Sequence, residues 1–408
     1  MDPRGRRAAR RGRAAVKSPH AGRRRLLQAL AAAPLVAQVP SLAAAPRSRR
    51  LFVMVFLYGG NDGYNTWVPY TDELYYRVRP RIAVPRDGVL KITDRHGFHP
   101  SLGALMPAWR ARDLAIVQGL GYADGTQQHF RDIDTAFTAC AGNEFSDQGW
   151  VTRALAGKAR ERAAITDAIA FDVLDIRAAD PMGPFRGEKL GVVQLYYASE
   201  LLASRRFADC SLVTNARGRE ELARASAPLA PVALKTRFAE ENFGQAMRAA
   251  VELAALDRSL PVIHVALNGL DGDKHHSVDC HWDQLKHHGD ALRRLAEGLA
   301  ALREGLIEIG RWDETLVATY DEFGRSPMEN QDHGTHHGLA TTHFVMGGRV
   351  KGGLHGEAPP VVRMHPIGGP APAIDTRELW TTVVERWWGA PSGGLFSRRY
   401  APLDLIRT

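Results

Sequence analysis

The stretch from residue 315 to residue 338 reads TLVATYDEFGRSPMENQDHGTHHG. Its first six residues, Thr315–Tyr320, have the character of a buried strand, and Glu322 follows almost directly. His336 and His337 come about fifteen residues after this carboxylate and are flanked by glycines. A carboxylate at a strand end with a nearby imidazole pair is typical of an α/β sheet that presents metal ligands.

Imidazole is concentrated in the same part of the chain, where ten of the sixteen histidines lie between His264 and His343. Imidazoles combined with carboxylates make a mixed nitrogen and oxygen site that suits Zn, Mn or Fe. Histidine clusters also occur as surface decoration. The metal prediction therefore depends on what stands at the other strand ends.

Several further apolar runs have strand length, and helical patterns lie between them. The runs are Leu51–Leu57, Leu114–Leu120, Ala168–Val173, Pro261–Leu267 and His343–Gly348. Residues 238–256 and 287–309 have apolar side chains at helical spacing. Apolar runs without alternation indicate strands buried on both faces, and their alternation with helices predicts an α/β fold with a mostly parallel sheet.

In such a sheet, ligands bind beyond the carboxyl ends of the strands. Four of the predicted strands are followed there by carboxylates or imidazoles. These are Asp62, His129, Asp271 with His275, and Glu322 with His337. One carboxylate after a strand is often a helix cap or a turn residue, but four such strand ends are harder to explain in that way.

The net charge of +8 belongs to the beginning of the chain. Residues 1–50 contain thirteen Lys and Arg and one acid, so they carry +12 and the remaining residues carry −4. A mildly acidic body does not favour a nucleic-acid partner for the folded domain.

Residues 1–45 have the pattern of an export signal. Arg23-Arg24-Arg25-Leu26-Leu27-Gln28 resembles the twin-arginine consensus, an alanine-rich segment follows, and Ala43-Ala44-Ala45 offers a cleavage site. The apolar segment is too short to predict a stable membrane span. We therefore expect contact with the twin-arginine translocase and a periplasmic or secreted protein. The alternative is a basic tail without a function.

The motifs GGNDG (59–63), QHF (128–130), QGW (148–150), EFGR (322–325) and GTHHG (334–338) occur in this order. Together with the closing YAPLDLI (400–406), they resemble the DUF1501 family of exported bacterial proteins over essentially all of residues 51–406. The resemblance groups the chain with the alkaline phosphatase and sulfatase superfamily. It implies an alkaline-phosphatase-like three-layer sandwich in one domain, residues 46–408, with a helical insertion around residues 174–255.

The resemblance also implies a centre of one or two divalent metal ions, with Zn, Mn, Fe and Ca as the candidates. Its ligands would be Asp62, Asp271, His275, Glu322 and His337. Arg325 would clamp a phosphate or sulfate oxygen, although a salt bridge that fixes the EFGR turn explains it equally well. His129 is a candidate ligand or general base, with a structural hydrogen bond as the alternative.

Three positions depart from the family pattern. Gln128 stands where the family commonly has a serine, and an amide cannot serve as the nucleophile. After the third strand the family usually reads Asp-Thr-His, whereas this chain has Asp271-Gly272-Asp273-Lys274-His275-His276. His336 replaces the acid of GTDHG.

Two functions remain open from the sequence. The first is an exported metal-dependent hydrolase of small-molecule or polymer-borne phosphate or sulfate esters, which uses water in place of the missing serine. The second is a non-catalytic periplasmic binding or assembly protein that retains the fold. Gln128 favours the second function. The charged side chains at the strand ends favour the first, because burying charge without a purpose is costly.

Overall fold

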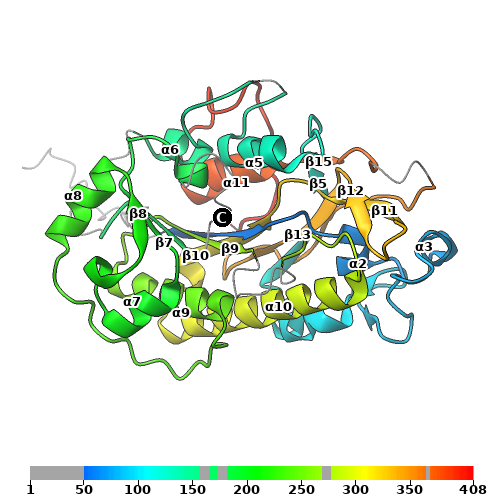
Figure 1. The fold of residues 1–408 in the computed structure, drawn as a ribbon, viewed down its shortest axis with the longest axis horizontal. Helices are drawn as coiled ribbons and strands as arrows, with labels where there is room; N and C mark the ends of the chain where they lie inside the picture. The colour runs from blue at the N-terminus through cyan, green and yellow to red at the C-terminus, as the bar shows by residue number, and fades with distance from the viewer. Residues whose placement is uncertain are drawn as a thin grey trace, which may run out of the picture. The chain divides into compact units, whose positions relative to one another are not determined.

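The computed structural model describes residues 50–142, 144–156, 165–171, 182–268, 277–363 and 368–407. Among these residues, ten strands form a central sheet (Figure 1). Nine of them follow the order β14-β5-β13-β10-β1-β9-β6-β7-β8, and β15 pairs with β5. Their bounds are β1 Leu51–Leu57, β5 Leu114–Gly121, β6 Ala168–Phe171, β7 Val192–Leu195, β8 Leu212–Thr214, β9 Val262–Leu267, β10 Thr315–Tyr320, β13 Thr341–Met346, β14 Gly353–Gly356 and β15 Ile374–Asp375.

The central sheet is mostly parallel. β1 pairs in parallel with β10 and β9, and β6 pairs in parallel with β9 and β7. β13 runs antiparallel to β10 and β5, and β8 runs antiparallel to β7. The carboxyl ends of β1, β9 and β10 therefore meet at one edge of the sheet, as the sequence predicts.

β1 shows why these apolar runs become central strands. All seven of its side chains are buried. Val53 and Val55 belong to the hydrophobic core on one face of the sheet, and Phe52, Met54 and Phe56 belong to the core on the other face. A strand covered on both faces reads as a continuous apolar run because neither face meets water.

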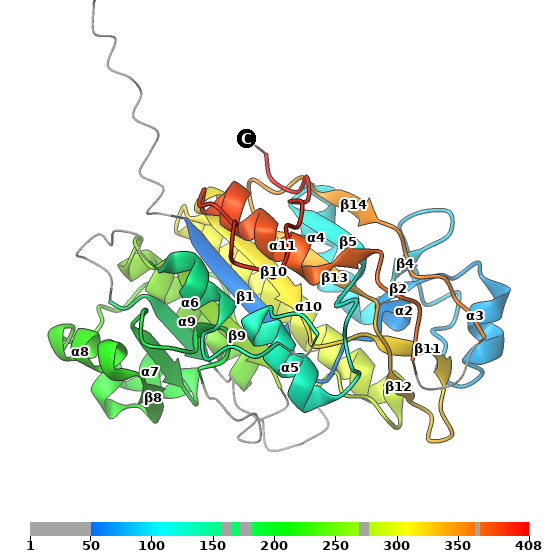
Figure 2. The same cartoon turned by 90° about the horizontal axis from the view of Figure 1, so that it is seen from above.

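Helices cover both faces of the sheet (Figure 1). On one face lie α7 (Ala198–Ser204), α9 (Asn242–Leu256) and α10 (Gln284–Glu308). On the other face lie α5 (His129–Thr138), α6 (Trp150–Leu155) and α11 (Thr376–Thr382), which Figure 2 shows above the strands. This arrangement confirms the predicted three-layer α/β sandwich. Five leucines of α10 form the buried face that the sequence pattern predicts: Leu292, Leu295, Leu299, Leu302 and Leu306.

The remaining described elements are short. Two small sheets consist of β2 (Trp67–Val68), β3 (Leu90–Lys91) and β4 (Gly97–Phe98), and of β11 (Arg325–Glu329) and β12 (Thr335–His337). The short helices are α2 Gly63–Thr66, α3 Glu73–Val78, η2 Pro100–Leu105, α4 Met106–Arg110, η3 Gly183–Phe185, η4 Phe207–Asp209, α8 Ala216–Arg224, η5 Trp312–Glu314 and the π-helix η6 Val383–Trp387.

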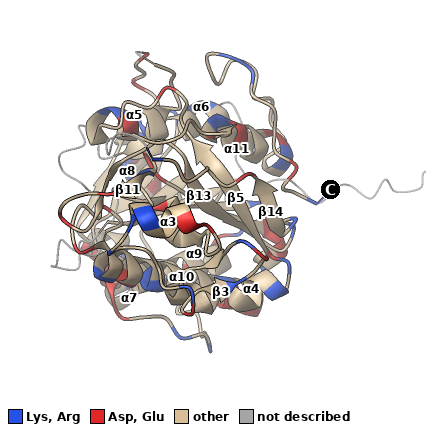
Figure 3. Cartoon of the chain, turned by 90° about the vertical axis from the view of Figure 1, so that its right-hand side faces the viewer, with Lys and Arg blue, Asp and Glu red and all other residues tan. Residues whose placement is uncertain are grey.

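Within residues 174–255, the predicted helical insertion, the described part supplies β7 and β8 to the central sheet as well as α7 and α8. No helix among the described residues has the length and apolarity that crossing a bilayer requires. Basic and acidic positions are interspersed over the side that carries α3 (Figure 3).

Candidate metal centre

Four side chains converge beyond the carboxyl ends of the central strands. His129, Asp279, His281 and His337 each offer one ligand atom, and these atoms all lie within 4.8 Å of one another. Nε2 of His281 lies 3.0 Å from Nε2 of His337, and Nε2 of His129 lies 3.8 Å from Oδ2 of Asp279. Three imidazoles and one carboxylate at this spacing could hold a divalent metal ion. We call these four residues the ligand cluster.

His129 enters the ligand cluster as the first residue of α5. The loop before it is fastened by the buried carboxylate of Asp132, which accepts hydrogen bonds from the backbone N–H of Thr126 at 2.8 Å and of Gln127 at 2.6 Å. Gln127 has a left-handed backbone with φ 62°. This turn fixes the residue at which α5 begins, so the imidazole of His129 lies beyond the carboxyl ends of the central strands.

Asp279 and His281 lie between β9 and α10, and two glycines make room for them. A Cβ at Gly59 would lie 2.3 Å from Cβ of Asp279, and a Cβ at Gly334 would lie 2.2 Å from the carbonyl carbon of His281. Asn330 donates a hydrogen bond to the carbonyl oxygen of His281 at 2.8 Å. The glycines of GGNDG and GTHHG thus allow the close approach of the segment that carries two cluster residues.

His337 is oriented by a backbone carbonyl. Its Nδ1 donates to the carbonyl oxygen of Gln127 at 2.6 Å, so its Nε2 carries the lone pair that faces the ligand cluster. The ring stacks on Phe323 with centroids 4.2 Å apart. Burial, together with the nearby charge of Arg325, lowers the pKa of His337 to about 3. The imidazole is therefore neutral and able to bind a metal at ordinary pH.

Glu322 stands behind His129. Its Oε1 is 2.9 Å from Nδ1 of His129 and accepts a hydrogen bond of 2.9 Å from the backbone N–H of Gly59. Burial raises the pKa of Glu322 against the opposing hydrogen bond from His129. Burial also acts to lower the pKa of His129, but the bond to Glu322 and the charge of Asp279 outweigh it and leave this pKa raised.

The second carboxylate oxygen of Glu322 is unusual. Oε2 is buried and has no hydrogen-bond partner within the described ranges of the chain. A buried carboxylate oxygen without a partner is costly, because its lost hydration is not replaced. Glu322, a predicted metal ligand, is not among the four residues of the ligand cluster, and its Oε1 contacts His129.

Arg325 lies among the cluster residues and is buried. Its Nη2 contacts the carbonyl oxygen of Gly59 and Oδ1 of Asp279. Its Nε and Nη1 donate to the carbonyl oxygens of Gly60 at 3.1 Å and Thr335 at 3.2 Å. These contacts match the salt bridge that fixes the EFGR turn, the alternative to a clamp on substrate. Burial acts to raise the pKa of Asp279, but His281 and Arg325 outweigh burial and lower it.

Asp62, a predicted ligand, makes other contacts in this structure. Its Oδ2 lies 2.5 Å from Nη1 of Arg79 and also accepts from Nε2 of Gln284. Its Oδ1 accepts from the backbone N–H of Tyr64 at 3.1 Å and caps α2. Burial opposes ionisation of Asp62, but Arg79 prevails and lowers its pKa. Asp62 is not among the four residues of the ligand cluster.

The structure therefore brings together the predicted residues His129, Glu322, Arg325 and His337. Asp271 and His275 lie outside the described residues. Sequence reasoning missed Asp279 and His281 as site residues. Their signal was present, because Asp279-Cys280-His281 has the Asp-x-His form expected eight positions earlier at Asp271. Cys280 between them is buried, and burial raises the pKa of its thiol to about 12, so a thiolate ligand is not favoured.

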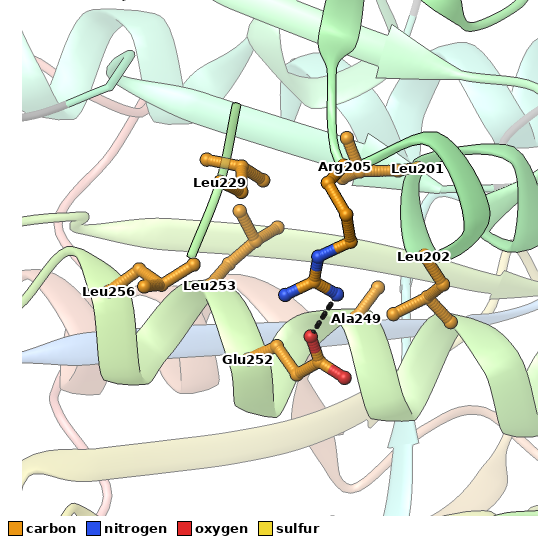
Figure 4. Close-up of a pocket in the computed structure, with 8 residues that line it drawn as sticks. All are labelled: Leu201, Leu202, Arg205, Leu229, Ala249, Glu252, Leu253 and Leu256. Carbon is orange, nitrogen blue, oxygen red and sulfur yellow. Dashed lines mark hydrogen bonds and ion pairs between the residues drawn. The ribbon is translucent and has the colours of Figure 1, made fainter. Parts of the chain in front are cut away.

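Two cavities lie away from the ligand cluster. The first, of about 10 Å³, lies between α7 and α9 under the ion pair of Arg205 and Glu252 (Figure 4). Such a volume is close to the minimum for one water molecule. The second, of about 420 Å³, is lined by Arg153 and by residues of the segment Gly389–Leu395. Neither cavity has a cluster residue in its lining.

No curated protein matches the chain. Among solved structures, it is similar to the lipoteichoic acid synthase LtaP from Listeria monocytogenes, with 10% identity, a TM-score of 0.39 and coverage of 85% of this chain and 74% of that one. It is similar to the PsFucS1 sulfatase from Pseudoalteromonas sp., with 10% identity, a TM-score of 0.39 and coverage of 87% and 70%. It is also similar to a protein in the alkaline phosphatase superfamily from Vibrio parahaemolyticus, with 9% identity, a TM-score of 0.39 and coverage of 84% and 67%.

One protein-family model matches the chain, over residues 212–366. This segment includes β9, β10 and β12 together with Asp279, His281, Glu322 and His337. The family is described as "Protein of unknown function (DUF1501)", and the match confirms the resemblance for this segment.

Proposed function

We propose that this protein is a metal-dependent hydrolase of phosphate or sulfate esters. The observation that carries the proposal is the convergence of His129, Asp279, His281 and His337 within 4.8 Å at the carboxyl edge of a mostly parallel sheet. Ligand sites of α/β sheets lie at this edge. The substrate class follows from the DUF1501 resemblance and from its grouping with phosphatases and sulfatases.

The ligand cluster fits a divalent ion. Three imidazoles and a carboxylate are ligands of Zn²⁺ and of similar ions, and ligand atoms of a tetrahedral zinc site lie about 3.3 Å apart. Nε2 of His281 and Nε2 of His337 are 3.0 Å apart, and the four ligand atoms all lie within 4.8 Å of one another. A bound divalent ion would polarise the ester and lower the pKa of a bound water.

The residues around the ligand cluster would position groups and hold charge. Glu322 holds the proton on Nδ1 of His129, which leaves Nε2 free for a ligand bond. The carbonyl of Gln127 does the same for His337. All four cluster side chains are partly exposed, so a substrate oxygen can approach them from solvent.

The nucleophile is most simply water. Gln128, at the serine position of the family pattern, precedes α5 and has no hydroxyl. The nearest hydroxyl in the sequence is that of Thr126, which donates a hydrogen bond to Oδ1 of Asp132 at 2.9 Å. This hydroxyl therefore stabilises the loop before α5.

A non-catalytic binding protein is the second candidate, and the ligand count favours it. Four protein ligands fill a tetrahedral zinc site, and filled sites are typical of structural zinc, whereas catalytic zinc keeps one position open. The two candidates therefore differ in whether the loaded site accepts a fifth ligand. Substitution with Co²⁺ and a visible absorption spectrum with and without inorganic phosphate would report this directly.

The deciding experiment combines metal analysis with turnover. Protein reconstituted with Zn²⁺, Mn²⁺, Fe²⁺ or Ca²⁺ would be assayed on aryl phosphate and aryl sulfate esters. His337→Ala should lose both the metal and the turnover. His355→Ala, on the edge strand β14, is the matched control and should keep both. Metal binding without turnover of either ester would favour the binding protein, and absence of metal would exclude the metallohydrolase.

The proposed compartment is the periplasm or the exterior of the cell. The support is the twin-arginine-like segment at residues 23–28 and the cleavage pattern at residues 43–45. Replacing Arg23, Arg24 and Arg25 with lysine should retain the protein in the cytoplasm, which cell fractionation would detect.

A further inference from the structure

Basic side chains gather at the edge of the central sheet that lies opposite the ligand cluster. β13 is antiparallel to both β10 and β5, so β5 runs in the same direction as β10. β5 therefore begins at the amino ends of the parallel strands, where its Leu114 pairs with Met346 and its Ala115 pairs with Gly353. The end of α4, the turn between β13 and β14, and residues 405–407 meet at this edge.

Backbone hydrogen bonds hold these three segments side by side. The N–H of Gly352 donates to the carbonyl oxygen of Arg112 at 3.2 Å, and the N–H of Arg407 donates to the carbonyl oxygen of Arg349 at 2.8 Å. The guanidinium of Arg407 also donates to the carbonyl oxygen of Arg112, at 3.0 Å. The basic residues that the three segments carry define what we call the basic patch: Arg110, Arg112, Arg349, Lys351 and Arg407.

Most of the positive charge of the basic patch is not paired within the protein. Three of its four arginines are exposed, and within the described part of the chain none of the four forms an ion pair. Lys351 is paired with Asp404, which is itself 86% exposed. Asp313 lies beside Gly348 and adds a second exposed carboxylate. The five cations exceed these two carboxylates, and like charges held side by side repel each other, so an external anion would stabilise this surface.

The chain enters the described fold beside the same surface. Arg50 directly precedes β1, and its Nη1 donates to the carbonyl oxygen of Arg386 at 3.1 Å. The bond to Lys351 lowers the pKa of Asp404, and the charge of the exposed Arg386 contributes to the same shift, so Arg386 lies close to the basic patch. Residues 47–50 read RSRR and follow the export-like segment directly.

From this arrangement we propose that the basic patch docks the folded domain on an anionic membrane surface, where its guanidiniums bind lipid phosphate groups. The planar donors of arginine match phosphate oxygens, and each cation near an anionic bilayer strengthens binding about fivefold. A membrane is favoured over an acidic protein because the sequence just before Arg50 is the apolar, export-like segment, which translocation brings to a bilayer.

This docking goes beyond the proposed hydrolysis and does not depend on the metal site. It does have a consequence for that site. Because the ligand cluster lies beyond the carboxyl ends of the strands and the basic patch lies at their amino ends, the docked protein would present the ligand cluster to the aqueous side, away from the lipid.

The test is vesicle binding by the full chain. Protein would be sedimented at low salt with vesicles of phosphatidylcholine, with and without phosphatidylglycerol. The patch variant combines Arg110→Gln, Arg112→Gln and Arg349→Gln. It should bind the phosphatidylglycerol vesicles at least tenfold more weakly than the parent, because three cations are removed. Raising NaCl to about 0.5 M should reduce this difference, because salt screens the attraction.

The matched control combines Arg77→Gln, Arg219→Gln and Arg237→Gln, three exposed arginines on other elements of the fold. Both variants keep residues 1–50 and lose the same charge, so a difference between them reports the basic patch. Circular dichroism would check that each variant is folded. A patch variant that binds as tightly as the parent, or a control that weakens equally, would overturn the proposal. Loss of binding to poly-L-glutamate with vesicle binding unchanged would also overturn it and would indicate an acidic protein as the partner.

Discussion

Glu322 and the carbonyl of Gln127 each hold the Nδ1 of one cluster imidazole, at 2.9 and 2.6 Å. A metal-binding histidine needs one nitrogen protonated and held so that the other presents its lone pair in a fixed direction. Both partners sit on loops that are themselves fastened, by Gly59 and by Asp132. The direction of these two ring nitrogens is thus set by groups outside the ligand cluster.

Glu322→Gln should weaken Zn²⁺ binding by about 10–100-fold, the usual cost of losing such an outer partner. The amide oxygen can still accept from His129, but the negative charge that makes the ring a better ligand is gone. Competition with a chelator would measure the affinity. Glu297→Gln on α10, where the side chain is 45% exposed, is the matched control and should bind as the parent does. Equal affinities for both variants would show that Glu322 does not support the ion.

Asp62→Ala should destabilise the folded protein by about 3–5 kcal/mol, because it leaves the charge of Arg79 buried without a partner. The pair is joined at 2.5 Å, and the two side chains are 0% and 1% exposed. Urea unfolding followed by circular dichroism would measure the change in the free energy of unfolding. A loss below about 1 kcal/mol, the usual value of an exposed pair, would mean that water reaches Arg79.

The turn after β1 connects the sheet to the ligand cluster. Gly59 and Gly60 have φ of +107° and +82°, which side chains rarely adopt. A Cβ on Gly60 would lie 2.6 Å from the ring of Phe323, as a Cβ on Gly59 would press on Asp279. The two glycines therefore allow the turn after β1 to pack closely against the segments that carry Asp279 and Phe323. This packing explains them without a phosphate-binding loop.

Gly59→Ala should cost about 1–3 kcal/mol of stability through overpacking, in addition to the strain of its backbone. It should also lower the metal affinity, because Asp279 must move away. Chemical denaturation and metal titration would give the two effects separately. Gly393→Ala, whose added Cβ meets nothing within 4 Å, should change neither. An unchanged metal affinity in Gly59→Ala would contradict the role of this turn in placing Asp279.

The strands that the sequence predicts are those buried on both faces. Five of these strands lie within a few residues of their predicted places: β1, β5, β9, β10 and β13. A strand that is buried on both faces has an unbroken apolar sequence, because neither face contacts water. The edge strands are different. β8 and β14 are only partly buried and contain polar or glycine residues, so their sequences carry no comparable signal.

The residues of the candidate site also differ in how clearly the sequence predicts them. His129, Glu322 and His337 could be found because each follows a strand or sits in a glycine-flanked motif. Asp279 and His281 lie in an irregular segment before α10, where the Asp-x-His form is a local signal but no periodicity predicts where the segment lies. Their place depends on contacts with Gly59, Gly334 and Asn330, which are far away in the sequence. Such contacts cannot be read from local patterns.

For the molecule as a whole, the sandwich buries several histidines away from the ligand cluster. His264 lies on β9 with its Nε2 2.6 Å from the hydroxyl of Tyr320, and its Nδ1 has no partner among the described residues. His288 lies in α10 beside Asn61, with Nε2 at 3.1 Å from the amide oxygen. Burial lowers the pKa of both imidazoles to about 3, and it lowers that of His99 to about 4.

These three histidines make the fold sensitive to acid. In the unfolded chain a histidine takes up a proton near pH 6.5, whereas in the fold these three stay neutral until about pH 4 or 3. Between those values the unfolded chain binds more protons than the folded chain, so the free energy of unfolding decreases as the pH falls below about 6.5. Above that pH these groups contribute no pH dependence.

The expected slope is about 1.4 kcal/mol per pH unit for each histidine that stays neutral in the fold. Urea unfolding at intervals between pH 7 and pH 4.5 would measure it. His264→Gln should lower the slope by the contribution of one histidine, because glutamine does not titrate. This change in slope is expected whatever the variant does to the free energy of unfolding at pH 7. The slope does not depend on the packing lost at Tyr320, so it isolates the charge. Equal slopes for the parent and His264→Gln would mean that His264 takes up its proton in the folded protein, and that the sheet around β9 admits water.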